Sequence, residues 1–176
     1  MPRDLLIACV GALASALIYA RAQPPAAPAA SAAQAAPAAG GTTSPIQRAD
    51  SAPKGSLKNP YNDTDAAIVD SGKTLYFGYA CSGCHGGAGG GGMCPPLTDG
   101  VWIYGGDDDT LFRLVAYGSQ DLQSKGYSRK GLENIVAPMP AMGQVVKTDD
   151  DLWRILTYVR SNYHGPPECK SGCPAQ

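Results

Sequence analysis

Two cysteines and a histidine stand together in the run Cys81-Ser82-Gly83-Cys84-His85. Two thiols at this spacing can each add to a vinyl group of a porphyrin, and the next residue then lies beneath the iron. The spacing therefore predicts covalent attachment of one c-type haem through Cys81 and Cys84, with His85 as an axial ligand. A thioredoxin-like motif expects a surrounding βαβ pattern, and a zinc site needs a second ligand pair at short spacing. Neither of these alternatives uses all three residues.

The second axial ligand separates electron transfer from ligand binding, because a thioether there raises the reduction potential and closes the iron to small molecules. Two methionines are candidates, in the run Ala137-Pro138-Met139-Pro140-Ala141-Met142. Prolines on both sides of Met139 hold the backbone in an extended form, so that its side chain projects in one direction. Met139 is therefore the predicted ligand, and Met142 is the alternative, with flexible packing on the haem as its other role.

Three helices are expected to position these residues. The first runs from Asp65 to Ala80, has small and apolar residues three or four apart, and leads directly into the cysteines. The second begins at Asp108 and stops at Gly118, and the third follows a Thr148 cap and three aspartates. Gly-rich and Pro-rich loops lie between them, with little strand-type alternation. The predicted fold class is all-α.

The N-terminal segment has the features of a secretory signal. Arg3 supplies a positive charge, Leu5–Ala20 is apolar, and Ala20-Arg21-Ala22 is a small-x-small cleavage site. The apolar stretch is shorter than the roughly 20 residues that a spanning helix needs. We therefore predict export to the periplasm, with no membrane span after cleavage. A retained N-terminal anchor is the alternative.

The predicted organisation has four parts. A signal peptide over residues 1–22 precedes a tether over residues 23–56, which is rich in Ala and Pro and too poor in large apolar side chains to offset the entropy of ordering. The haem domain spans residues 57–165, and residues 166–176 form a tail with cysteines. Overall charge is balanced, with 14 basic and 15 acidic residues and a net charge of −1. Within Lys58–His164, however, 12 acidic and 9 basic residues give a charge of −3, which argues against a nucleic-acid partner.

Three cysteines remain after the signal and the haem motif are set aside, namely Cys94, Cys169 and Cys173. In an oxidising compartment an odd number predicts one disulfide and one free thiol. We favour a bridge from Cys94 to Cys169 or Cys173, because it would close the longer loop. Pairing of Cys169 with Cys173 is the alternative.

The order of these motifs resembles the class I cytochrome c family: a first helix running into C-x-x-C-H, a Pro-Leu loop, a Met-Pro loop and a last Leu-Trp...Tyr-Val helix. The resemblance implies three to five helices around one covalently bound haem, with the first and last helices crossing. It implies that Gly72 and Tyr76 meet Ile155 and Tyr158 at the crossing.

The same resemblance assigns residues around the haem. It implies that the Pro95 carbonyl accepts a hydrogen bond from His85 Nδ1 and that Leu97 lies against the porphyrin. The methionine of the family's Met-Pro pair corresponds to Met139. For Trp102 and Tyr104 two roles are open, since each has a polar group that could reach a haem propionate and an aromatic ring that could pack in the core.

A narrower resemblance covers the stretch from Gly89 through the Pro95-Pro96 loop to Gly106, which is similar to the cytochrome that accepts electrons from methanol dehydrogenase. The extra cysteines are similar to those of a four-cysteine, methanol-metabolism-related group of c-type cytochromes. The implied function is that of a monomeric electron carrier, which is not an enzyme. Its implied donor is a quinoprotein (PQQ-dependent) methanol or alcohol dehydrogenase, and its acceptor is a downstream cytochrome c or oxidase.

Two other functions fit the same motifs. The domain could be a membrane-tethered or fused haem subunit of another dehydrogenase or oxidase complex, held close to its partner by the tether. It could also be an enzyme or gas sensor, which would require an open iron without a firm sixth ligand.

Overall fold

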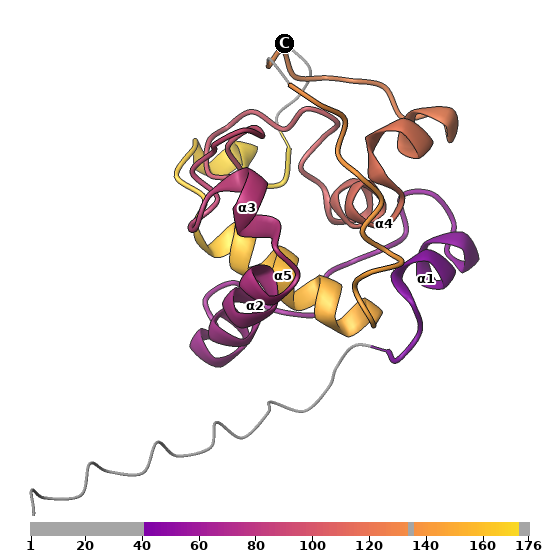
Figure 1. The fold of residues 1–176 in the computed structure, drawn as a ribbon, viewed down its shortest axis with the longest axis horizontal. Coiled ribbons are helices and arrows are strands. Elements are labelled where there is room, and N and C mark those ends of the chain that lie inside the picture. The colour runs from indigo at the N-terminus through magenta and orange to yellow at the C-terminus, as the bar shows by residue number, and fades with distance from the viewer. Residues whose placement is uncertain (1–40, 134–135, 173–176) are drawn as a thin grey trace, which may run out of the picture. The chain divides into compact units, whose positions relative to one another are not determined.

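The computed structural model describes residues 41–133 and 136–172, all of which belong to the second of two units of the chain, Gln34–Gln176. Five α-helices and one short 3-10 helix make up this part: α1 (Pro45–Ser51), α2 (Ala66–Gly78), α3 (Cys81–His85), α4 (Asp108–Ser124), α5 (Asp149–Ser161) and η1 (Pro167–Cys169) (Figure 1). Within these ranges there is no strand, so the all-α prediction is confirmed for them. None of the described helices is both long and apolar enough to cross a membrane.

Helices α2 and α5 begin where the sequence predicts. Asp65 caps α2, and its carboxylate accepts hydrogen bonds from the backbone of Ala67 and Ile68 at 3.0 and 3.3 Å. Thr148 caps α5, and its hydroxyl accepts from the Asp151 amide at 3.1 Å. These side chains satisfy backbone donors that a helix start leaves without intrahelical partners.

Helix α4 continues past its predicted end. The expected stop at Gly118 is present as a kink, because Gly118 has φ 75° and ψ 169°, which is not helical. The chain then turns again as a helix as far as Ser124. The sequence prediction was therefore right about the interruption and wrong about the residues after it.

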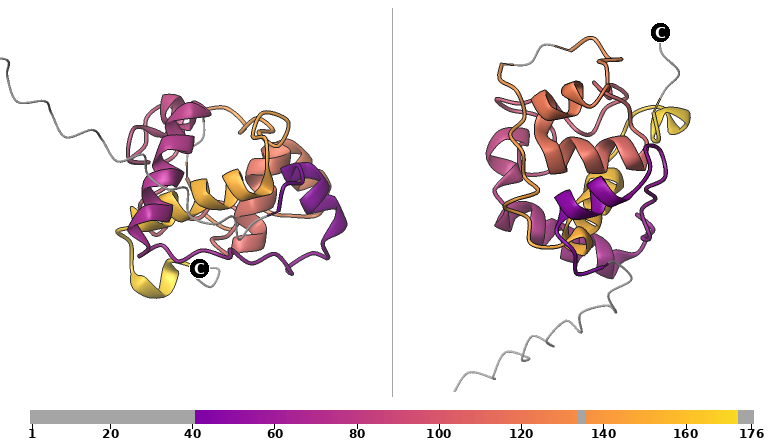
Figure 2. Two further views of the ribbon diagram at one scale, coloured as in Figure 1. Left: turned by 90° about the horizontal axis from the view of Figure 1, so that it is seen from below. Right: turned by 90° about the vertical axis from the view of Figure 1, so that its right-hand side faces the viewer.

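The most extensive helix contact among the described residues is the crossing of α2 and α5, which Figures 1 and 2 show from three directions. A Cβ atom at Gly72 would lie 2.0 Å from the Arg154 carbonyl oxygen and 3.0 Å from Tyr158 Cβ, so only glycine permits this approach. One turn later the rings of Tyr76 and Tyr158 meet at 5.2 Å between centroids. Together with buried Ile155, these are the residues that the family resemblance places at the crossing.

Part of the predicted tether is folded. Helix α1 lies within residues 23–56, beside α4 (Figure 2), and starts with a capping box formed by Ser44 and Gln47. Its Ala49 is only 1% exposed. The expectation of disorder is therefore wrong from Ser44 onward; residues 1–40, which include the predicted signal peptide, lie outside the described part of the chain.

A buried arginine explains why this segment folds despite its composition. Arg113 of α4 donates hydrogen bonds to the carbonyls of Ala49, Ala52 and Pro53 at 2.6, 2.8 and 3.1 Å. Its Nε lies 2.9 Å from Asp109, which holds the guanidinium in place. The prediction of disorder was based on the small number of apolar side chains in this segment. The interaction that holds the segment is instead between a charged group and backbone carbonyls.

We predict that Gly72→Ala will destabilise the fold by roughly 3 kcal/mol or more, since its methyl group must push two helix backbones apart. Denaturant unfolding measures this free energy. The matched control is Gly78→Ala at the end of the same helix, where an added Cβ would meet nothing within 4 Å. That variant should be as stable as the parent or slightly more stable. Equal stability of the two variants would contradict the close crossing.

Candidate functional site

Helix α3 brings the three motif residues to one cavity. It follows α2 after Ala80, which has a left-handed backbone with φ 60°, and ends at His85, with Gly86 as its C-cap. Positions i, i+3 and i+4 of a helix share a face, so Cys81, Cys84 and His85 point in related directions. All three line the same cavity of about 330 Å³.

The ring of His85 is oriented by the loop that follows α3. Its Nδ1 lies 2.8 Å from the Pro95 carbonyl oxygen, the partner that the family resemblance implies. Because a carbonyl can only accept, Nδ1 carries the proton, and the Nε2 lone pair is left for a metal. The Cys94 amide donates to the Cys84 carbonyl at 3.1 Å, which folds this loop back on the motif.

Two tyrosines from the helix crossing hold the end of α3. The Tyr76 hydroxyl donates to the Gly86 carbonyl at 2.9 Å, and the Tyr158 hydroxyl donates to the Gly87 carbonyl at 3.0 Å. Burial raises the pKa of Tyr76, so its hydroxyl remains a donor. The crossing thus positions the residues directly after His85, a connection that the sequence prediction did not include.

The Met139 segment enters the cavity from another part of the chain and is fastened to α4. The Met139 amide donates to Ser119 Oγ at 3.0 Å, and the Ser119 amide donates to the Met139 carbonyl at 2.9 Å. A Cβ at Gly118 would lie 2.6 Å from the Ala141 nitrogen. Met142 also lines the cavity, and its amide donates to the Val115 carbonyl at 2.9 Å. The Met139 segment therefore packs against the kink in α4 and is hydrogen-bonded to it.

The remaining walls are mostly apolar. Leu97 lies in the cavity lining, as expected, with other side chains that include Ile103, Leu111, Leu114, Ile155 and Val159. Glu133 is an acidic residue in this lining, and its Oε2 is buried and has no hydrogen-bond partner among the described residues. Burial raises the pKa of Glu133, and the nearby charge of Asp99 adds to this effect while Arg129 opposes it.

Trp102 and Tyr104 both line the cavity, but their polar groups have protein partners. Trp102 Nε1 donates to the Cys169 carbonyl at 2.9 Å, so this N–H already has a protein acceptor. The Tyr104 oxygen accepts from Gln123 Nε2 at 2.9 Å, which leaves its own proton for another acceptor.

The favoured disulfide is not present. Cys94 is a free thiol in the cavity lining beside Cys84, whereas Cys169 is buried, disulfide-bonded and in contact with Trp102. The backbone bond from Cys94 to Cys84 holds it in the motif loop, away from the tail. Burial raises the pKa of the Cys94 thiol, and its contact with Cys84 adds to this. Cys173 lies outside the described residues.

The donor set fits a c-type haem. The thiols of Cys81 and Cys84 are free, and burial raises the pKa of Cys81, which keeps it a neutral thiol. His85 offers Nε2, and the thioethers of Met139 and Met142 line the same largely apolar cavity. A volume of this order falls within the roughly 300–1,000 Å³ of ligand and cofactor sites.

Comparison with known proteins points to the same cofactor. The model of the cytochrome c family matches residues 69–162. Two relatives are both named Cbb3-type cytochrome c oxidase subunit CcoP: that of Azospirillum brasilense is 40% identical over 62 residues, 31% of this chain and 21% of that protein. That of Cereibacter sphaeroides is 43% identical over 58 residues, 31% of this chain and 20% of that protein. The chain thus spans about a fifth of the length of the curated relatives it matches.

A solved structure is also similar. Cytochrome CL from the marine methylotrophic bacterium Methylophaga aminisulfidivorans MPT has 26% sequence identity to this chain, a TM-score of 0.46, and coverage of 61% of each chain.

We predict that Gly118→Ala will loosen the Met139 segment and reduce the free energy of unfolding by about 3 kcal/mol, because a side chain meets both backbone strain and a clash there. Gly126→Ala is the control, since Gly126 also has a positive φ of 81° but only a lysine tip at 3.9 Å. It should cost roughly 1 kcal/mol. Hydrogen exchange at the Ser119 amide should accelerate only in Gly118→Ala. Equal losses in the two variants would show that the close approach does not matter.

Proposed function

Because the chain belongs to the cytochrome c family, and so to proteins with a covalently bound haem c, we propose that it is a monohaem electron carrier. The main support for this proposal is that Cys81, Cys84 and His85 lie on one face of α3. The His85 Nδ1 is held by the Pro95 carbonyl at 2.8 Å. Haem c, when bound, supplies exchange of one electron. The protein transforms no substrate in this proposal.

The proposed roles of the residues follow from their chemistry. Cys81 and Cys84 would hold the group by thioether bonds, each formed when a thiol adds across a vinyl group. His85 would give its Nε2 lone pair to the iron, and the Pro95 carbonyl would keep the ring in the required tautomer. Apolar residues such as Leu97 exclude water from the site, which favours the less charged, reduced form.

Met139 is the proposed sixth ligand. Two hydrogen bonds to Ser119 fix its backbone, and prolines on both sides limit its conformations. Met142 is the alternative, although its partial burial against the core fits a packing role. A thioether ligand would close the iron to external molecules, which distinguishes a carrier from a gas sensor or an enzyme.

The proposed donor is a quinoprotein methanol or alcohol dehydrogenase, and the proposed acceptor is a downstream cytochrome c or oxidase. This donor is supported by the sequence similarity of the stretch from Gly89 to Gly106 to methanol-related cytochromes. Transfer would take place across a small, transient interface of under about 1,200 Å². The proposed location is the periplasm, which depends on the signal-like residues 1–22; N-terminal sequencing of the mature protein distinguishes cleavage from a retained anchor.

A second candidate is a haem subunit of a membrane oxidase or dehydrogenase complex. The relatives named CcoP favour it, since their similarity covers about a third of this chain. Co-purification of the full chain with an oxidase from detergent-solubilised membranes would support this candidate, and recovery of the haem protein in the periplasmic fraction without a partner would contradict it.

We predict that Met139→Ala will allow the reduced protein to bind carbon monoxide at neutral pH and will lower the reduction potential, because the iron loses its thioether. Absorption spectra of the haem measure both effects. Met142→Ala is the matched control, and it should exclude carbon monoxide as the parent does. The assignment is reversed if only Met142→Ala opens the iron.

Mixing the oxidised protein with a quinoprotein methanol dehydrogenase under turnover should reduce the haem within the time range of a stopped-flow experiment. Added salt should change the rate more than the affinity, because charges at the rim of an interface act mainly on encounter. If the haem stays oxidised while the dehydrogenase turns over with an artificial acceptor, this donor is excluded.

A further inference from the structure

The C-terminal segment 166–172 folds back on the loop that forms one wall of the cavity. The Cys169 carbonyl accepts the hydrogen bond from Trp102 Nε1, and Cys169 itself is 7% exposed and disulfide-bonded. The Trp102 ring is stacked on that of Tyr163, with 5.9 Å between centroids and an interplanar angle of 9°. The orientation of this wall residue therefore depends on residues beyond the end of α5.

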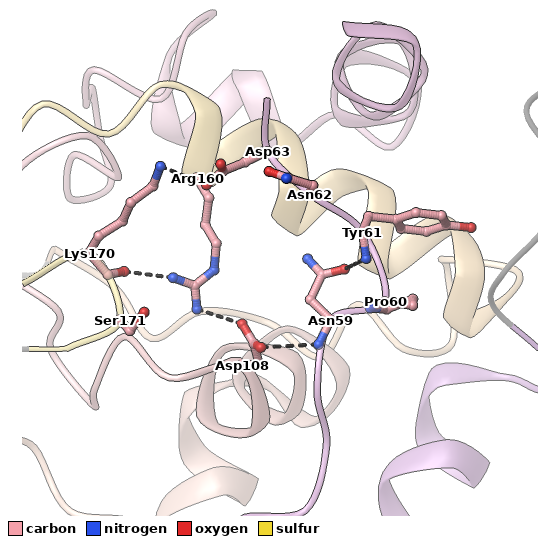
Figure 3. Close-up of a pocket in the computed structure, with 9 residues that line it drawn as sticks. All are labelled: Asn59, Pro60, Tyr61, Asn62, Asp63, Asp108, Arg160, Lys170 and Ser171. Carbon is pink, nitrogen blue, oxygen red and sulfur yellow. Dashed lines mark hydrogen bonds and ion pairs between the residues drawn. The ribbon is translucent and has the colours of Figure 1, made fainter. Parts of the chain in front are cut away.

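One guanidinium connects this segment to the rest of the fold. Arg160, in the last turn of α5, donates to the Lys170 carbonyl at 2.6 Å (Figure 3). It donates to the Gly106 carbonyl at 2.5 Å. It also pairs with Asp108 at the start of α4, at 2.7 Å. Lys170 adds a second attachment, since its ammonium group lies 2.6 Å from Asp63. Arg160 thus joins the tail, the cavity loop and α4.

We propose that Arg160 is a positioning residue for the haem site, which fixes Trp102 in the cavity wall by holding segment 166–172 and Gly106 together. The inference rests on the proposed haem function. A fixed wall keeps water from the porphyrin, and the environment of a haem sets its reduction potential. Arg160 is not among the residues that line the cavity, so its effect passes through its neighbours.

The test compares Arg160→Lys with Arg154→Lys in the holoprotein. Lysine keeps the charge but cannot reach several acceptors with a planar fork. Arg154 is the matched control because it also lies on α5, pairs with an aspartate at 2.8 Å, and has 7% side-chain exposure against 8% for Arg160. Three residues to which its side chain donates hydrogen bonds, Asp150, Tyr61 and Ser71, do not line the cavity.

Two measurements test whether Trp102 stays fixed in the cavity wall. In the reduced protein, the Trp102 indole N–H should exchange at least tenfold faster in Arg160→Lys, a factor that corresponds to about 1.4 kcal/mol of lost protection. At a fixed solution potential, the ratio of reduced to oxidised haem should fall about fivefold, the scale of one hydrogen bond. Arg154→Lys should change neither quantity, although it loses stability.

Trp102→Phe tests the cavity wall with Arg160 left in place, because it removes the indole N–H and keeps a smaller aromatic ring at this position. It should lower the reduced fraction as Arg160→Lys does, and the double variant should be less than additive. The proposal is overturned if Arg160→Lys leaves the exchange rate of the Trp102 N–H and the reduction potential unchanged. It is also overturned if both lysine variants shift these quantities equally, or if the effects of Arg160→Lys and Trp102→Phe are fully additive. A colourless parent protein would instead contradict haem binding, so the two failures are distinguishable.

Discussion

The contact between Gly72 and the Arg154 carbonyl governs the rest of the structure. The absence of a side chain lets α2 and α5 touch, and this contact places Tyr76 and Tyr158 where their hydroxyls reach the carbonyls after His85. The same helix α5 carries Arg160 in its last turn, two residues after Tyr158, against the tail. The helix that packs on Gly72 therefore positions both the motif helix α3 and the attachment of the cavity wall.

Loops build most of the site, and backbone hydrogen bonds make them rigid. The Pro95 carbonyl orients an imidazole, and reciprocal bonds with Ser119 hold the Met139 segment. Such bonds give a short irregular segment a defined shape without a large core of its own. This is a suitable arrangement for a carrier, because little reorganisation is required when one electron arrives or leaves.

Sequence reasoning was most successful where a short run of residues strongly favours one local structure or one kind of site. The Asp65 and Thr148 caps, the interruption at Gly118 and the family membership carried by C-x-x-C-H are all of this kind. It failed where a distant partner decides the outcome. The folding of α1 depends on Arg113, and the partner of Trp102 is the Cys169 carbonyl, which belongs to a segment 67 residues away. No local pattern around α1 or Trp102 contains that information.

The free thiol of Cys94 also bears on how the molecule is assembled. Before any porphyrin is bound, the sulfurs of Cys84 and Cys94 are neighbours, and an oxidant can join neighbouring thiols. Such a bond would consume one of the two sulfurs that α3 offers to the vinyl groups. For the proposed attachment of haem, we expect that Cys84 must stay reduced until its thioether bond has formed.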